Sequence, residues 1–259
     1  MTVSFSRIWA IASNGFREVI RDRILYLIGL FALLLVIALR FLPQVAAGTE
    51  DKIIIDFGLA AIGVLGVIVA VFVGTSVINK EIDKRTLLVL IPKPLNRAEL
   101  IVGKHLGLCG VLTVLTVAMT AIYLIVLSFS QIKYPLGTIL VSTLYLLLQL
   151  SLIAAVALLF SVFTSSLLAA LLTFGIYLMG NLSPDLLKFG NLSRNPNLVK
   201  MTEGLYLVLP DLSRLNLKNE AVYGMLPSPL TLLGNGAYGV FYTVLLLAIA
   251  ILIFSQREF

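Results

Sequence analysis

Charged residues are scarce in this chain. Asp, Glu, Lys and Arg together make up 12% of its 259 residues, whereas about 25% is usual in a soluble protein. Apolar residues make up 59%, which leaves too little polar surface to cover a water-soluble globule. The composition therefore predicts an integral membrane protein and excludes the ordinary soluble domain of this length.

Cysteine and histidine occur once each, as Cys109 and His105. They cannot supply an intrachain disulfide or a His/Cys zinc cluster. The sequence also lacks the HExxH, GxSxG and HRD motifs of familiar enzymes and the GxxxxGKS/T loop that binds ATP. Gly234–Gly239 match the GxGxxG pattern, but they open an apolar run, which favours helix packing over a dinucleotide site. We therefore expect no catalytic residue, metal site or cofactor in this chain, and no enzyme activity of its own.

Long apolar runs dominate the rest of the sequence. A membrane-spanning helix needs about 20 apolar residues, and none of these runs shows the alternating polarity of a β-barrel strand. Six stretches qualify, at residues 24–42, 53–78, 106–129, 137–160, 166–182 and 230–254. The sequence predicts a single all-α integral membrane domain over residues 1–259, with six transmembrane helices.

The distribution of Lys and Arg predicts the orientation. Eleven of the 19 basic residues lie in the N-terminal segment, in residues 79–104 and at the C-terminus, which would all face one side. Basic residues accumulate on the cytoplasmic side of membrane proteins. We therefore expect both termini in the cytoplasm, and we attribute the net charge of +6 to this bias and not to nucleic-acid binding.

Residues 4–22 differ from the spans because their polarity alternates with a helical period. Phe5, Trp9 and Phe16 share one face with other apolar residues, and Arg7, Arg17 and their polar neighbours take the other. This pattern predicts an amphipathic helix in the membrane–water interface, ahead of the first span. The alternative is an N-terminal extension of span one.

The loop at residues 79–104 combines features that a simple anchor does not need. A charged segment, Lys80–Arg85, precedes an apolar patch, Leu87–Ile91, and Pro92 and Pro94 then stop the helix. Asn96 is placed to cap a new helix that runs through Glu99. The charges alone fit a positive-inside anchor, whereas the patch and the prolines indicate a loop that holds a shape at the membrane surface.

Polar and small residues inside the spans have several interpretations. Span two contains Gly63, Gly66 and Gly74, which permit close approach by another helix of this chain, by a second copy or by a substrate. Arg40 and Asp56 lie near the outer ends of their spans, which indicates snorkelling or a mutual ion pair. The outer loop at residues 183–229 is long, and we predict short helices in it, broken at Pro196 and Pro210.

The loop after span two resembles that of ABC-2-type transporter permeases. The matching residues are Glu81, Lys84-Arg85-Thr86, Pro94, Arg97 and Gly103-Lys104. Lys84-Arg85-Thr86 is similar to the subgroup that contains the membrane subunit of the nitrous oxide reductase copper-site maturation transporter. Residues 16–26 and 209–224 resemble that subgroup too.

The resemblance implies an export permease of a bacterial plasma membrane that works by alternating access. It implies two permease copies, with a homodimer expected, and two copies of a cytoplasmic ATPase that bind ATP and Mg²⁺. It makes residues 79–104 the coupling loop, with Glu81, Lys84, Arg85, Thr86, Pro94, Arg97 and Lys104 as candidate coupling residues. It also places the translocation path or dimer seam at spans two and five, with Gly63, Gly66, Gly74, Thr173 and Tyr177 as candidates.

Two other functions compete with this interpretation. A secondary transporter usually needs buried titratable groups and an internal repeat, and we find neither pattern in the sequence. A non-transporting membrane scaffold is the second alternative. Its discriminating test is whether an ATPase purifies with the chain and depends on it for activity.

Overall fold

The computed structural model describes residues 4–21, 25–45, 48–83, 96–193 and 195–256, and every regular element in those ranges is a helix. The elements are α1 (Phe5–Val19), α2 (Leu25–Val45), α3 (Glu50–Asp83), α5 (Arg97–Phe129), α6 (Leu136–Phe163), α7 (Ser166–Asn181), α8 (Ser183–Leu192), α9 (Pro196–Val208), the 3₁₀ helix η2 (Leu212–Leu215), α10 (Lys218–Tyr223) and α11 (Pro229–Gln256). The predicted all-α class is confirmed for the described residues.

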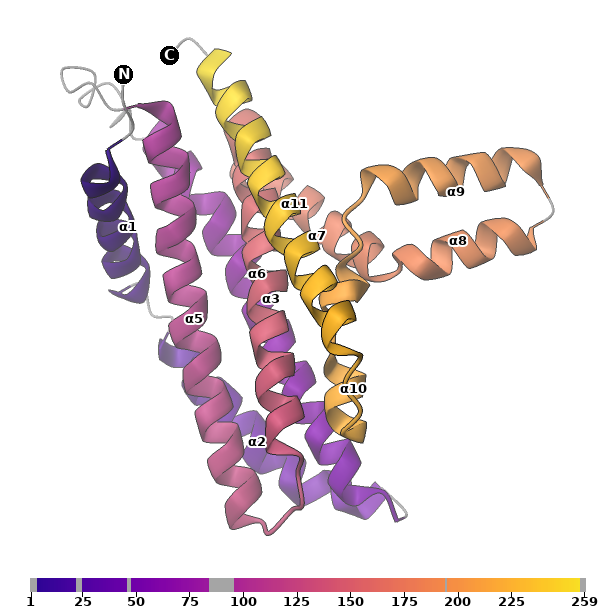
Figure 1. Cartoon of the computed structure of the whole chain (residues 1–259). Coiled ribbons are helices and arrows are strands. Elements are labelled where there is room, and N and C mark those ends of the chain that lie inside the picture. Colours follow the sequence, from indigo (N-terminus) through magenta and orange to yellow (C-terminus); the bar gives the residue numbers. More distant parts are fainter. Residues whose placement is uncertain (1–3, 22–24, 46–47, 84–95, 194, 257–259) are drawn as a thin grey trace.

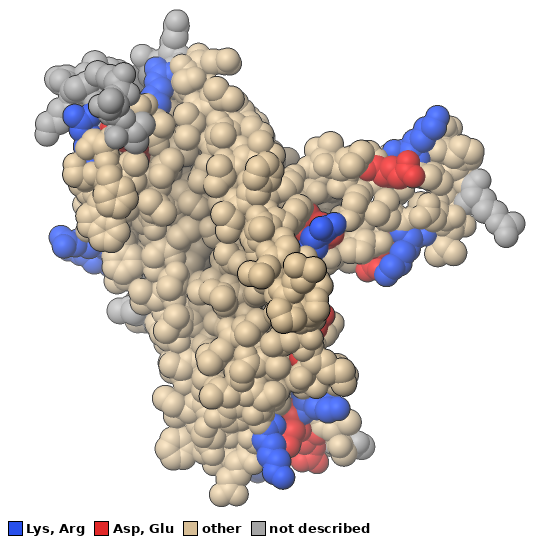
Figure 2. Space-filling view, viewed as in Figure 1, with Lys and Arg blue, Asp and Glu red and all other residues tan. Residues whose placement is uncertain are grey.

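Five helices are long and apolar enough to cross a membrane: α2, α3, α5, α6 and α11. They coincide with five of the six predicted spans. On the face drawn in Figure 2, the charged side chains gather at the two ends of the bundle, beside α1 and on the α8–α9 hairpin. Charged atoms also show at the root of the hairpin and below it, and most of the remaining surface in this view is uncharged.

The remaining predicted span, residues 166–182, is α7. Its 16 residues rise about 24 Å at 1.5 Å each, less than the ~30 Å hydrocarbon core. The chain bends by 63° between α7 and α8, and a sixth apolar crossing exists only if this bent pair is taken as one span. The pair is therefore a broken span or a re-entrant segment.

The central helix of the bundle is α6. It contacts α3, α5, α7, α10, η2 and α11, and every residue from Leu152 to Leu158 is at most 2% exposed. A helix that is apolar on all sides is buried by its neighbours. The alanines among these residues let the neighbouring helices approach α6 closely.

Helix α1 lies along the first half of α5 (Figure 1). It packs against three glycines of α5: Ile11 lies against Gly103, Ala12 against Gly107 and Phe16 against Gly110. The helix predicted within residues 4–22 is therefore present, and one face of it packs against protein. Phe5 and Trp9 lie on the exposed face.

The outer loop folds into the predicted short helices. α8 and α9 form an antiparallel hairpin that projects sideways from the bundle (Figure 1). α9 begins at Pro196 and ends before Pro210, as expected for a residue tolerated only in the first turn of a helix. Gly190 lets the two helices meet, because Thr202 fills the place that a Cβ would take.

Candidate functional site

The predicted coupling residues are only partly described by the structure. Lys84, Arg85, Thr86 and Pro94 lie outside the described residues. Glu81 falls in the last turn of α3, and only its backbone is described. Arg97 and Lys104 lie on the first turns of α5, where the chain returns from the loop.

The start of α5 is fixed by a capping box. The Asn96 side chain accepts a hydrogen bond from the backbone N–H of Ala98 at 3.2 Å, and Glu99 Oε2 accepts one from the N–H of Asn96 at 3.4 Å. The first N–H groups of a helix have no acceptor within the helix, and this motif supplies acceptors for two N–H groups at the helix start. The cap predicted at Asn96 is confirmed, and it makes residues 96–99 one fixed turn.

Glu99 also binds the start of α1. Its side chain is fully buried, Oε1 accepts the backbone N–H of Ser4 at 2.8 Å, and Oε2 lies 3.8 Å from Nη1 of Arg7. A buried carboxylate needs such donors to offset its lost hydration. Sequence reasoning used Glu99 only as a helix residue, although its spacing from Asn96 is the signature of a capping box.

Arg97 binds the other end of the chain. Its Nη1 donates to the carbonyl oxygens of Phe254 at 2.7 Å and Ser255 at 2.6 Å, and its guanidinium lies 5.9 Å from the centre of the Phe254 ring. The last carbonyls of α11 lack partners within the helix and carry partial negative charge. Arg97 supplies both a donor and a positive charge to that end.

The contact between α1 and α5 is close because α5 carries glycines there. A Cβ on Gly107 would lie 2.7 Å from the carbonyl oxygen of Ala12, and one on Gly103 would lie 2.8 Å from Cβ of Ile11. Lys104 is buried on the same stretch of α5, with its aliphatic stem against Gly15. The first turns of α5 therefore hold α1 and the end of α11 together.

A comparison with family models identifies the chain. The model described as ABC-2 family transporter protein matches residues 9–259. The chain belongs to the ABC-2 transporter family. No curated protein matches it. The permease is thus a multi-pass membrane component of an ABC transporter, and its lack of a P-loop sequence agrees with a family whose members have no ATPase site of their own.

The candidate path residues of this permease fall in two groups. A Cβ on Gly66 would meet Leu150 of α6, and one on Gly74 would meet Ala157 of α6 and Leu108 of α5. These two glycines therefore pack α3 within the chain. Thr173 is buried and donates to the carbonyl of Ala169 at 2.7 Å.

Gly63 and Tyr177 are less enclosed. The Cβ that a larger residue would add at Gly63 would lie 3.8 Å from Leu146, an ordinary contact distance. Tyr177 is half-buried on α7, with its ring 6.1 Å from that of Phe174. On α3, the exposed stripe is formed by Val64, Ile68 and Phe72, one residue every fourth position. The glycines thus set the position of α3 and leave this stripe on its outer surface.

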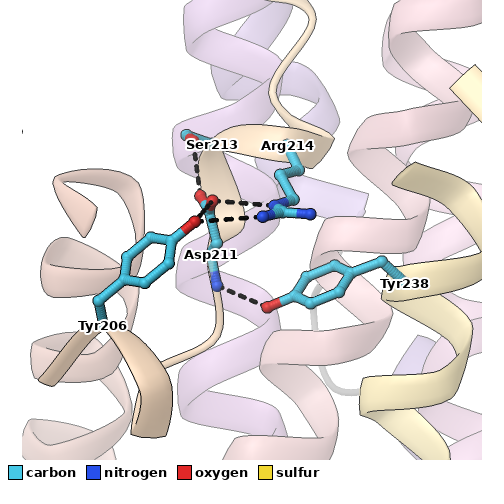
Figure 3. A network of polar contacts seen from close by, with 5 residues as sticks. All are labelled: Tyr206, Asp211, Ser213, Arg214 and Tyr238. Carbon is cyan, nitrogen blue, oxygen red and sulfur yellow. Dashed lines mark hydrogen bonds and ion pairs between the residues drawn. The ribbon is translucent and has the colours of Figure 1, made fainter. Parts of the chain in front are cut away.

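A polar network joins the α8–α9 hairpin to α11 of the permease (Figure 3). Asp211 Oδ2 accepts from Nε of Arg214 at 3.0 Å, and Oδ1 accepts from Ser213 at 2.6 Å. Nη2 of Arg214 donates to the Tyr206 hydroxyl at 3.1 Å, and the backbone N–H of Asp211 donates to the Tyr238 hydroxyl at 2.8 Å. The hydrogen bonds to Tyr206 and Asp211 raise the pKa of Arg214.

The network links three elements, because Tyr206 lies on α9, Arg214 on η2 and Tyr238 on α11. The Arg214 guanidinium also lies 5.0 Å from the centre of the Tyr238 ring. Sequence reasoning missed this cluster, although the i, i+3 spacing of Asp211 and Arg214 was available as a signal.

The ion-pair partner of Asp56 differs from the one that the sequence suggested. It pairs with Lys218 of α10 at 3.2 Å, where the sequence had suggested Arg40 as a possible partner. Lys52 lies 4.8 Å from the centre of the Tyr223 ring beside this pair. These contacts fasten the N-terminal end of α3 to α10.

Proposed function

We propose that the chain is the membrane-spanning permease subunit of an ATP-binding cassette exporter. In this proposal two copies form a homodimer in a bacterial plasma membrane, and two copies of a separate cytoplasmic ATPase bind ATP and Mg²⁺. Closure of the ATPases drives the dimer between inward and outward access. The observation that carries the proposal is the ABC-2 family match over residues 9–259 in a chain without a P-loop.

We further propose that residues 79–104 form the coupling loop, with Glu81, Lys84, Arg85, Thr86 and Pro94 contacting the ATPase. The apolar patch Leu87–Ile91 and its flanking charges support this role, because an apolar core with a polar rim is the usual anatomy of a protein interface. The cap at Asn96 supports it as well, since it makes the return of the loop a fixed turn.

The proposed topology has six spans, with α7 and α8 together as the fifth and α1 at the cytoplasmic interface. The positions of basic residues support it. We place the translocation path and the dimer seam along α3 and α7, near Gly63, Thr173 and Tyr177. The exposed stripe of α3 supports this placement, and Gly66 and Gly74 contribute indirectly by fixing α3 against α6.

We also propose that the chain falls in the subgroup that resembles the nitrous oxide reductase maturation transporter. The support is the Lys84-Arg85-Thr86 sequence together with residues 16–26 and 209–224. A comparison of growth with and without the gene, under conditions that demand active nitrous oxide reductase, tests this assignment. Unchanged reductase activity in the deletion strain would place the chain in another branch of the family.

The test of the main proposal is reconstitution. A tagged chain expressed in its native host should capture an ABC ATPase, and the complex in lipid vesicles should hydrolyse ATP faster than the isolated ATPase. The control is an ATPase whose P-loop lysine is replaced, which should assemble without hydrolysis. Failure of the ATPase to associate with correctly inserted chain would overturn the proposal and would favour a scaffold or a secondary transporter.

A further inference from the structure

We propose that Arg97 is a positioning residue that carries the motion of the loop after α3 to α11, the last helix of the chain. The inference rests on the proposed function and goes beyond it, because it assigns the route by which the loop moves a helix that is distant in sequence. Arg97 and Phe254 are 157 positions apart and are joined by a direct hydrogen bond.

The contact has the features of a mechanical link. Arg97 is the first residue of α5, immediately after the capping residue Asn96. Its guanidinium bonds two successive carbonyls at the end of α11, those of Phe254 and Ser255. A charge-assisted pair of bonds to backbone atoms moves with the helix as a whole, whereas a contact to one flexible side chain does not.

The surrounding residues make the link stiff. The capping box joins Asn96 to Glu99, so the first turn of α5 moves as one unit. Glu99 in the same turn is fully buried and bonds the N–H of Ser4, which ties α1 to that unit. Phe254 is 2% exposed and belongs to the cluster that includes Ile78 of α3, Ile101 of α5 and Leu158 of α6. A displacement of Asn96 should therefore displace the end of α11 as well, because these contacts join the two helix ends rigidly.

This assignment differs from the role expected for Arg97 from the sequence resemblance, which was contact with the ATPase. The two roles make opposite predictions about a bridge within the chain. If Arg97 positions α11, a covalent bridge between the same two helix ends should restore the ATP hydrolysis that is lost without Arg97. If Arg97 contacts the ATPase, such a bridge restores nothing.

The experiment uses the full complex with its ATPase in lipid. The background is Cys109→Ser, since Cys109 is the one cysteine of the chain. The variants are Arg97→Ala, Arg97→Lys and the pair Arg97→Cys with Ser255→Cys, which a short bifunctional thiol reagent bridges and a reductant releases. Arg17→Ala, an exposed arginine on α1, is the matched control.

We expect Arg97→Ala to keep its ATPase stoichiometry while permease-dependent ATP hydrolysis falls by about fivefold or more, the lower end of usual coupling strengths. Arg97→Lys should retain part of the activity, and Arg17→Ala should retain all of it. The cysteine pair should be inactive when reduced, active when bridged and inactive again after release. Recovery on bridging distinguishes positioning from a loss of stability alone.

Two results would overturn the inference. One is an assembled Arg97→Ala complex with unchanged hydrolysis. The other is a bridged pair, verified by mass spectrometry, whose hydrolysis stays at the reduced level. A wild-type chain that never stimulates the ATPase would instead overturn the proposed function, so the two failures are distinguishable. If Arg97→Ala does not accumulate, the cysteine pair alone tests the inference, because ATP hydrolysis is compared between the bridged and released states of one purified sample.

Discussion

Gly107 of α5 lies so close to Ala12 of α1 that a Cβ on Gly107 would stand 2.7 Å from the Ala12 carbonyl oxygen. The obstacle is backbone, which cannot rotate away as a side chain can. Gly103, one turn earlier, also meets α1, where its added Cβ would lie 2.8 Å from Cβ of Ile11 and 3.1 Å from the Ile8 carbonyl oxygen. The contact therefore requires glycine and holds α1 against α5.

Gly107→Ala should destabilise the permease by about 1–3 kcal/mol, the usual cost of overpacking, and should loosen α1. The measurement is the thermal unfolding midpoint of the purified chain, together with protease cleavage near the N-terminus. Gly137→Ala on α6 is the matched control, because nothing lies within 4 Å of its added Cβ. Equal midpoints for the two variants would mean that α1 does not pack as described.

Removing Arg214 should release the α8–α9 hairpin from the bundle. Arg214→Ala leaves Asp211, which is 6% exposed, without its cation, and loss of one member of such a network costs about 1–3 kcal/mol. We expect faster protease cleavage around residues 205–212 and a lower unfolding midpoint. Lys200→Ala, an exposed position on α9, should change neither.

A smaller effect is expected at Tyr238. Tyr238→Phe removes the acceptor for the Asp211 backbone N–H while keeping the ring beside Arg214, so its effect on the midpoint should be about half that of Arg214→Ala, near 1 kcal/mol for a single hydrogen bond. If Tyr238→Phe were the more damaging change, the hydroxyl and not the ion pair would hold the hairpin.

Thiol labelling tests the orientation. In a Cys109→Ser background, single cysteines at Arg17, Lys84 and Gln256 should be shielded from an impermeant reagent in intact cells, and one at Lys200 should react. The expectation follows from the excess of basic residues on one side. Labelling of Lys84→Cys in sealed cells would reverse the assignment, and disrupted cells provide the control for reactivity.

Local features of the fold could be predicted from the sequence because they depend on neighbouring residues. Asn96 is a favoured capping residue just before an apolar run, so the start of α5 could be predicted. Pro196 and Pro210 likewise indicated where α9 begins and ends. Five of the six spans predicted from the apolar runs match long apolar helices for the same reason.

Features that join distant segments could not be predicted. Arg97 looked like a surface charge in the loop, since nothing in the sequence pairs it with the carbonyls of Phe254 and Ser255. Likewise, nothing in the sequence pairs Gly103 and Gly107 of α5 with α1. The 63° bend after α7 was invisible to hydropathy, because the apolar run continues to Leu182.

Asp56 shows how a correct chemical expectation can miss the partner. A carboxylate near the end of a span requires a cation, and the sequence offered Arg40, which lies near the outer end of the preceding span. The fold brings Lys218 there by way of α10, after a stretch of chain whose path the sequence does not specify.

The central claim is that loop 79–104 couples this permease to an ATPase, and the most direct measurement is ATP hydrolysis by the purified complex in lipid. The test variant replaces Glu81, Lys84 and Arg85 with alanine, which spares Arg97 and its bonds to α11. The control replaces Asp185 and Lys188, an exposed ion pair on α8 at 3.0 Å. We predict that the control hydrolyses ATP at the wild-type rate, while the loop variant inserts and dimerises but no longer raises hydrolysis above that of the ATPase alone. Wild-type stimulation by the loop variant would contradict the account and would reduce the loop to a topological anchor.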